Sequence, residues 1–236
     1  MKNVLWFSAG VSSFIAGYLL GEAVDEIIYI DIADQHEDSL RFLHDCETFL
    51  DKEITMIKSP YGSVENVVKQ FKYINGVAGA RCTQVLKKRV REEWEYKNPD
   101  IKSYIWGYDL DEKKRADRLV EYLDTKEHRF PLIENSLTKQ DCHGILANLG
   151  IKRPAMYEMG YQNNNCVGCV KGGMGYWNRI RTDFPEVFKS RAKLERLIGA
   201  SCINGVYLDE LEPKRGIFEE DIPRSCGMFC YLAMKD

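Results

Sequence analysis

The sequence lacks an excess of charge of one sign. Its 236 residues carry 33 Lys and Arg against 36 Asp and Glu, so the formal net charge is −3 and the isoelectric point is about 5.9. This balance excludes the chain-wide basic excess that marks many nucleic-acid-binding proteins. A basic patch confined to one face of the protein is still compatible with it.

Long hydrophobic runs are also lacking. The N-terminus imitates a signal peptide, because it is largely apolar up to Leu20, but Ser8, Gly10, Ser12 and Ser13 interrupt the run. No run reaches the roughly 18 apolar residues that a membrane span requires. We therefore predict a cytoplasmic protein with no membrane partner. The sequence also has no internal repeat and no low-complexity linker.

What the chain has in abundance is cysteine, with eight residues. Secreted disulfide scaffolds are usually short, whereas this chain is 44% hydrophobic and long enough to bury a core without disulfides. In a cytoplasmic protein the cysteines stay reduced. Their positions then indicate metal or redox chemistry.

Strands alternate with helices over the first half of the chain. This alternation predicts an α/β fold, a parallel twisted sheet with helices on both faces and ligands outside the carboxyl ends of its strands. Beyond about residue 130 the pattern changes, so we predict an α/β domain over residues 1–135 and a Cys-rich helical and irregular region over 136–236 packed on it. The expected strands are 4–7, 27–32, 54–57 and 103–108; the expected helices are one of about ten residues ending near Gly21, then 38–50, 63–71, 83–96, 111–123, and helices between 175 and 199.

The 8–13 loop, which follows the first strand, consists of small residues. Ser8, Gly10, Ser12 and Ser13 would let backbone N–H groups and hydroxyls converge on an anion at the start of a helix. An ordinary tight turn explains the same residues about equally well. The loop is neither a GxxxxGK[ST] nor a GxGxxG sequence, which counts against those nucleotide-binding classes.

Five cysteines occur where they could form one site. Cys166 and Cys169 lie in a polar, glycine-rich segment, Cys226 and Cys230 lie near the C-terminus, and Cys82 is a fifth candidate. Soft thiolate ligands of this kind select zinc or an iron–sulfur cluster. The alternatives for the Cys166–Cys169 pair are a redox dithiol and a loop pair with no chemical role.

The remaining three cysteines are expected to be structural. Cys46 and Cys142 lie in or near amphipathic helices, and we interpret both, together with Cys202, as buried small hydrophobic residues.

Two basic runs begin just after loops that we expect at the carboxyl ends of the strands, where the ligand would bind. Lys87 and Arg115 within them are our candidates for contacts to phosphate or sulfate oxygens. The plainer interpretation is a pair of solvated helix faces, and the same patch could instead receive the phosphates of tRNA or DNA. His36 follows the second strand, where it could contact a nucleotide.

Several segments match, in order, the motifs of one known family. The matches are degenerate, and their order carries more weight than any one of them. The 8–13 loop corresponds to SGGxDS, residues 29–31 and 35–38 to the loop after the second strand, 81–87 to CCxxxK, Gly107 with Glu112 and Arg115 to GxxxxExxxR, 130–132 to a short Pro-Leu motif, Cys166 with Cys169 to CxxC, and 225–229 to ECGLH.

In these segments the chain resembles the PAPS reductase-like family of PP-loop, or N-type ATP pyrophosphatase, proteins in the adenine nucleotide alpha-hydrolase-like superfamily. The resemblance implies a Rossmann-like fold and an adenine nucleotide substrate, ATP or PAPS/APS, with Mg²⁺ where ATP is cleaved. It places the nucleotide against the 8–13 loop, Asp31, His36 and Gly107. It also favours a 4Fe-4S cluster over Zn²⁺.

The resemblance further implies that the thiols have different roles. Cys82, Cys166, Cys169 and Cys230 would hold the cluster, and Cys226 would be the catalytic nucleophile. Cys226 and Cys230 are interchangeable in this scheme. The rival is a closed zinc site formed by Cys166, Cys169, Cys226 and Cys230.

Departures from the family pattern indicate a diverged member. Ala9 replaces the second glycine of the loop and Ser12 its carboxylate, which would serve Mg-dependent ATP cleavage. A single Cys82 stands where cluster-binding relatives carry a pair, and Ser225 and Phe229 replace the Glu and His of the C-terminal motif.

We therefore expect an oxidoreductase that reduces a sulfonucleotide with a thiol reductant, or a sulfurtransferase that uses ATP, a sulfur donor protein and a tRNA or DNA acceptor. The alternative is a non-catalytic nucleotide-sensing or nucleic-acid-binding protein with structural zinc. The oligomeric state does not follow from the sequence.

Overall fold

The computed structural model describes residues 1–76, 79–123 and 126–218. Its contacts divide the chain into two compact units. The first unit comprises Met1–Asp31, Glu37–Ile57 and Arg91–Asn164, and the second comprises Ile32–His36, Lys58–Val90 and the described residues from Asn165 onward.

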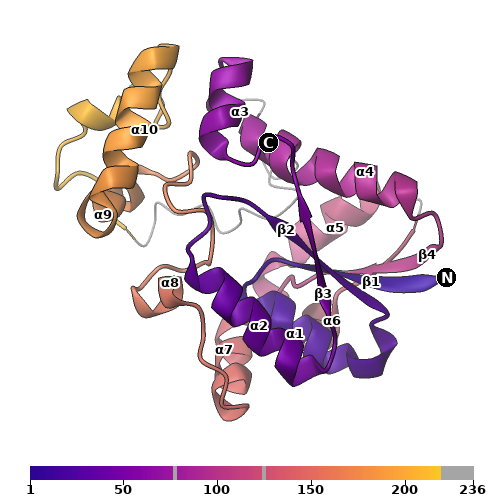
Figure 1. Cartoon of the computed structure of the whole chain (residues 1–236). Coiled ribbons are helices and arrows are strands. Elements are labelled where there is room, and N and C mark those ends of the chain that lie inside the picture. Colours follow the sequence, from indigo (N-terminus) through magenta and orange to yellow (C-terminus); the bar gives the residue numbers. More distant parts are fainter. Residues whose placement is uncertain (77–78, 124–125, 219–236) are drawn as a thin grey trace. The chain divides into compact units, whose positions relative to one another are not determined.

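The first unit contains a five-stranded sheet, counted over the described residues (Figure 1). Its order is β3-β2-β1-β4-β5, and β1 pairs in parallel with β2 and β4, as β4 does with β5. The chain therefore leaves β1 toward one side of the sheet and later returns to the other, which makes the carboxyl ends of β1 and β4 the switch point where ligands of such sheets bind. The strands are β1 (Lys2–Phe7), β2 (Glu26–Asp31), β3 (Ile54–Lys58), β4 (Ile101–Ile105) and β5 (Glu127–Arg129).

Burial of apolar side chains fixes this sheet at the centre of the first unit. The last four residues of β1 are each at most 3% exposed, and α1 packs on β1 and on α2, α6 and α7. The helices of this unit are α1 (Val11–Leu20), α2 (Asp38–Leu50), most of α4 (Arg89–Lys97), α5 (Lys113–Tyr122), α6 (Pro131–Glu134), α7 (Lys139–Asn148) and α8 (Ala155–Glu158), with short 3-10 turns η1 (Gly21–Ala23) and η3 (Leu110–Glu112).

The second unit is helical in its described residues. Its long helix α10 packs against α3 and α9. Its elements are α3 (Val64–Phe71), the π-helical turn η2 (Thr83–Lys88), α9 (Met174–Asp183), α10 (Pro185–Ile198) and the 3-10 turn η4 (Leu208–Glu210).

The predicted α/β class with a parallel sheet is confirmed. Helix 38–50 begins and ends where its amphipathic pattern predicts, and the four expected strands occur with ends shifted by up to three residues. β5 was missed, because a three-residue Glu-His-Arg strand has no apolar alternation. The expected helix 83–96 begins instead as the π-helical turn η2. Among the described residues, no helix has both the length and the hydrophobicity to cross a membrane.

Candidate functional site

The 8–13 loop connects β1 to α1 and bonds largely to itself. The Ser13 hydroxyl donates to the Gly10 carbonyl at 2.8 Å and accepts the Ser8 N–H at 3.2 Å, and the Ser8 and Ser13 hydroxyls lie 3.1 Å apart. Gly10 is the N-cap of α1 and provides no side-chain cap. An anion entering this loop would therefore compete with bonds between the serines.

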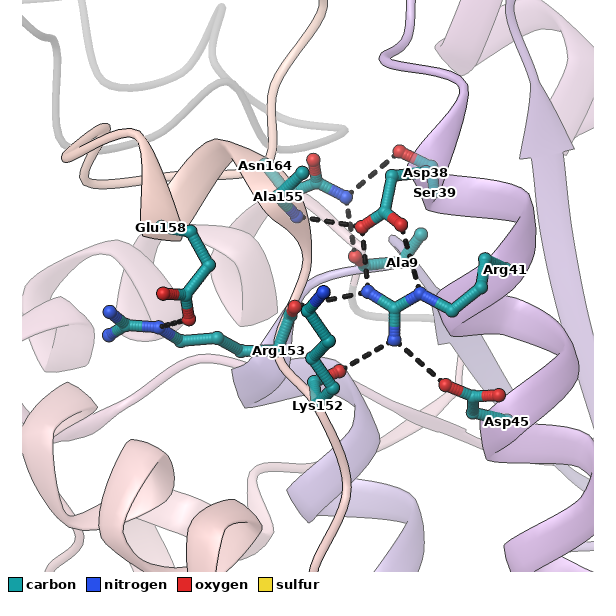
Figure 2. Close-up of polar contacts among 10 residues, drawn as sticks. All are labelled: Ala9, Asp38, Ser39, Arg41, Asp45, Lys152, Arg153, Ala155, Glu158 and Asn164. Atoms are coloured by element: carbon teal, nitrogen blue, oxygen red, sulfur yellow. Dashed lines mark hydrogen bonds and ion pairs between the residues drawn. The ribbon is translucent and has the colours of Figure 1, made fainter.

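Ala9 holds the loop in an unusual backbone conformation. Its φ is +54°, in the left-handed region that favours glycine, and the residue is fully buried. The Asn164 side-chain amide donates to the Ala9 carbonyl at 2.7 Å and to the Ser39 hydroxyl at 3.0 Å (Figure 2). The loop is thus fastened to the start of α2 and to the end of the first unit.

Gly107 follows β4, the second strand of the switch point, and packs against the 8–13 loop. A Cβ on Gly107 would lie 2.5 Å from Cα and 2.6 Å from the backbone nitrogen of Ser13. Only glycine allows this approach. Both strand ends that define the predicted ligand edge therefore come together in the first unit.

Asp38, which lies in a segment matched to the nucleotide-facing loop, is part of an ion-pair network. Arg41 bonds both carboxylate oxygens of Asp38, Asp45, and the carbonyls of Lys152 and Arg153, at 2.6 to 3.0 Å (Figure 2). Asp38 also accepts the N–H of Ala155 at 2.7 Å, at the start of α8. The network fastens the segment before α8 to α2, which is a structural role.

The other predicted nucleotide and oxyanion contacts fall in both units. Asp31 is the last residue of β2 in the first unit, whereas His36 belongs to the second, with its ring edge-on to Phe184 at 5.9 Å. Arg115 pairs with Glu112 at 2.5 Å, and its guanidinium lies 4.4 Å from the centre of the Tyr108 ring.

Three predicted metal ligands and Lys87 line one cavity of the second unit, which we call the cysteine cavity. Cys82 precedes η2 and Lys87 lies within it, while Cys166 and Cys169 come from the segment before α9. The cavity is about 20 Å³. Its other walls are formed mainly by apolar side chains, Ile32, Val64, Leu86 and Val170 among them.

Tyr176 of α9 shapes the segment that carries the cysteine pair. Its hydroxyl accepts the N–H of Cys169 at 2.9 Å and donates to the carbonyl of Cys166 at 3.3 Å. Gly168, between them, has φ +71°, and a Cβ there would lie 2.6 Å from a Val187 methyl group. The turn of the CxxC segment therefore requires glycine.

Asp34 is a residue that the sequence analysis missed, and it organises the same segment. Its carboxylate pairs with the buried Arg191 at 2.5 Å and accepts the N–H of Val64 at 2.6 Å, and its carbonyl accepts the N–H of Val167 at 2.7 Å. Arg191 also donates to the carbonyl of Gly168 at 3.3 Å. Asp34 and Arg191 are 157 residues apart, so no local pattern relates them.

The donor chemistry of the cysteine cavity suits a soft metal, because three thiols line it. Among the described residues, however, no three His, Cys, Asp or Glu side chains are grouped closely enough to hold a metal ion. Cys226 and Cys230, the remaining predicted thiols, lie outside the described residues, as do Ser225 and Phe229.

The three cysteines expected to be structural are buried. Cys46 and Cys142 are fully buried and Cys202 is 6% exposed, and burial raises the pKa of each thiol, to about 12 for Cys142. The N–H of Cys202 donates to the carboxylate of Glu195, which also accepts the N–H of Leu208. No disulfide joins any of the cysteines that the structure describes.

Comparison with known proteins finds similarity in structure. No protein-family model matches the chain, and no curated protein matches it in sequence. The structure is similar to the crystal structure of phosphoadenylyl-sulfate (PAPS) reductase from Candida auris in its phosphate complex. The TM-score is 0.49 at 13% sequence identity, and the match covers 69% of this chain and 80% of that chain.

Proposed function

We propose that the protein is an enzyme that binds an adenine nucleotide, ATP or PAPS/APS, and carries out thiol-dependent sulfur chemistry on it. The observation that carries the proposal is the cysteine cavity. Two chain segments more than 80 residues apart bring Cys82, Cys166 and Cys169 to one small cavity with Lys87. If the Lys87 ammonium reached these thiols, it would favour the thiolate, which is both the nucleophile and the metal ligand.

The 8–13 loop is the proposed nucleotide contact. It lies at the switch point of a parallel sheet, where the approach of Gly107 to Ser13 joins the two strand ends. Bound phosphate oxygens would replace the bonds between the Ser8 and Ser13 hydroxyls with bonds to the ligand. Asp31, the last residue of β2, and Arg115, near the start of α5, would also contact the nucleotide.

Two reactions are consistent with this chemistry. In the first, the Cys226 thiolate attacks the sulfur of PAPS or APS, a sulfur–sulfur bond forms, and the sulfur–oxygen bond to the nucleotide phosphate breaks. An external thiol then attacks the cysteine sulfur, releasing sulfite and leaving a disulfide. In the second, ATP adenylates a tRNA or DNA acceptor with loss of pyrophosphate, and a sulfur donor protein loads a cysteine as its persulfide. The outer sulfur of the persulfide displaces AMP from the acceptor, and a second thiol then breaks the sulfur–sulfur bond, which releases the thiolated acceptor and leaves a disulfide.

Cys82, Cys166, Cys169 and Cys230 are the residues proposed to hold a 4Fe-4S cluster, which would supply electron-transfer or Lewis-acid chemistry. A cavity of about 20 Å³ has room for about one water-sized particle. A four-iron cluster is larger than this space, so the walls of the cavity would have to separate to hold it.

The test is incubation of anaerobically purified protein with ATP and with PAPS, followed by assays for AMP, pyrophosphate and sulfite. We expect sulfite with PAPS and a thiol reductant, or AMP and pyrophosphate with ATP and an acceptor. Cys166→Ala should abolish the product, whereas Cys46→Ala, which removes a buried thiol outside the cavity, should retain it. Absence of nucleotide binding would refute the proposal.

One observation favours the second candidate, a non-catalytic nucleotide-sensing or nucleic-acid-binding protein with structural zinc. The cysteine cavity, at about 20 Å³, is closer in volume to a single ion than to a four-iron cluster. Brown protein absorbing near 400 nm would indicate a cluster, and colourless protein with one zinc per chain would indicate this candidate.

A further inference from the structure

The first unit contains a cleft of about 730 Å³ that the proposed function does not use. We call it the α7 cleft, because α7 contributes to one wall and the segment after Gly150 to the other. Its volume lies in the range of pockets that hold small organic molecules and far exceeds that of an inorganic ion. The residues that bear on its chemistry are Asp111, Lys139, His143, Arg153, Tyr157 and Tyr161.

Two cations and one acidic residue line the cleft. Lys139 bonds the side-chain oxygen of Asn163, its ammonium lies 5.8 Å from the centre of the Tyr157 ring, and burial lowers its pKa. Arg153 is more exposed and donates from Nε to Glu158 at 2.5 Å, and a guanidinium has four further N–H groups. A bound anion would offset the desolvation of Lys139.

His143 adds a polar atom that lacks a partner. Its Nδ1 is buried with no hydrogen-bond partner among the described residues, and its ring meets Tyr157 edge-on at 4.7 Å. Burial and the charges of Lys139 and Arg153 lower the pKa of His143 to about 4, so the ring is neutral near pH 7. A buried nitrogen without a partner costs free energy that a ligand hydroxyl or amine would recover.

Tyr157 connects the cleft to the 8–13 loop. Its ring lines the cleft, while its hydroxyl accepts a backbone hydrogen bond from Val11, the first residue of α1. The same hydroxyl lies 3.3 Å from where a Cβ of Gly10 would be. A ligand in the cleft would therefore bind against the side chain that touches the loop.

We propose that the α7 cleft binds a small organic molecule carrying a phosphate or sulfate group. Lys139 and Arg153 bind the oxyanion, Nδ1 of His143 bonds a hydroxyl or amine of the ligand, and Tyr157 and Tyr161 pack against its carbon skeleton. This site is separate from the cysteine cavity and does not depend on the sulfur chemistry proposed above.

The test is NMR of protein with isotope-labelled histidine, titrated with AMP, inorganic phosphate and inorganic sulfate. The signal of His143, assigned with His143→Gln, should move with AMP, and AMP should bind more tightly than either inorganic ion. Lys139→Met and Arg153→Gln should each weaken binding at least about tenfold. The exposed neighbour Lys152, changed to Gln, is the matched control and should leave the affinity unchanged.

Three outcomes would overturn the proposal. These are an unmoved His143 signal, unchanged AMP affinity in both cation variants, or equal affinity for AMP and inorganic phosphate. Because Arg153 is half-exposed, its variant tests the proposal even where Lys139→Met fails to fold. If only Ser13→Ala weakened AMP binding, the ligand would lie at the 8–13 loop; the cleft proposal would then fail while the nucleotide proposal stood.

Discussion

The 8–13 loop and the cysteine cavity are built in different ways. The loop is one continuous segment at the end of a buried strand, and its serines bond one another. The cysteine cavity is assembled from separate segments, and the buried pair of Asp34 with Arg191 holds one of them in place. The first arrangement depends on backbone conformation and the second on a long-range ion pair. Disturbing the two should therefore have different consequences.

The largest effect is expected from breaking the ion pair. Arg191→Met leaves the Asp34 carboxylate buried without its cation, and should cost about 3–5 kcal/mol of unfolding free energy. It should also raise the alkylation rate of Cys166, because Arg191 bonds the carbonyl of Gly168. Urea unfolding and mass spectrometry of alkylated thiols measure both.

Arg196→Gln is the control for this variant. Arg196 pairs with Asp209 and Glu210 at the surface, where such pairs contribute little. A loss of stability as large as that of Arg191→Met would mean that the buried pair has no special role.

Asp109 of the first unit contrasts with Asp34. Its carboxyl is also buried, but its Oδ1 has no hydrogen-bond partner among the described residues. Burial and the charge of Glu112 raise its pKa from 3.8 to about 6. The folded state therefore holds the proton of the Asp109 carboxyl more tightly than the unfolded state does. The protonated carboxyl contributes its full stabilisation of the folded state below pH 3.8, and this stabilisation is lost as the pH rises through about 6.

Asp109→Asn should remove this pH-dependent loss of unfolding free energy, which amounts to about 3 kcal/mol at neutral pH. Urea midpoints measured across that pH window should fall in the native protein and stay more nearly constant in the variant. Asp117→Asn, an exposed carboxyl on α5, should leave the native profile unchanged. An identical pH profile for native protein and Asp109→Asn would contradict the raised pKa.

Gly107→Ala tests the close approach at the switch point. The added methyl group would overlap the backbone of Ser13, and we expect a loss of about 1–3 kcal/mol in unfolding free energy. Gly144→Ala is the matched control, since nothing lies within 4 Å of its Cβ position in α7 and alanine favours helix. Thermal unfolding should show the first variant destabilised and the second stabilised.

The smallest effect is expected at the positive-φ residues of the two regions. Ala9→Gly should stabilise by up to about 1 kcal/mol, because glycine adopts φ +54° without steric cost. Gly168→Ala should destabilise, since its φ of +71° suits glycine and a Val187 methyl group is close. Urea unfolding that gave both changes the same sign would refute this explanation.

The fold was largely predictable because its signals are local. Apolar runs predicted β1, β2, β3 and β4, and an amphipathic repeat predicted α2 over the same residues that the structure shows. β5 had no such signal, because three residues show no periodicity and its strand pairing comes from β4. The catalytic role of Cys226 and the ligand role of Cys230 stay predictions.

Hydrophobic periodicity and glycine or serine content act over a few residues, so the α/β class, the parallel sheet and the small-residue loop at the end of β1 follow from local patterns. Tertiary packing, in contrast, brings Cys82 to the same cavity as Cys166 and Cys169, and Asp34 to Arg191. It also produced the α7 cleft, whose residues have no distinctive spacing. Contacts between distant segments depend on how whole elements pack, and a local pattern carries no information about that packing.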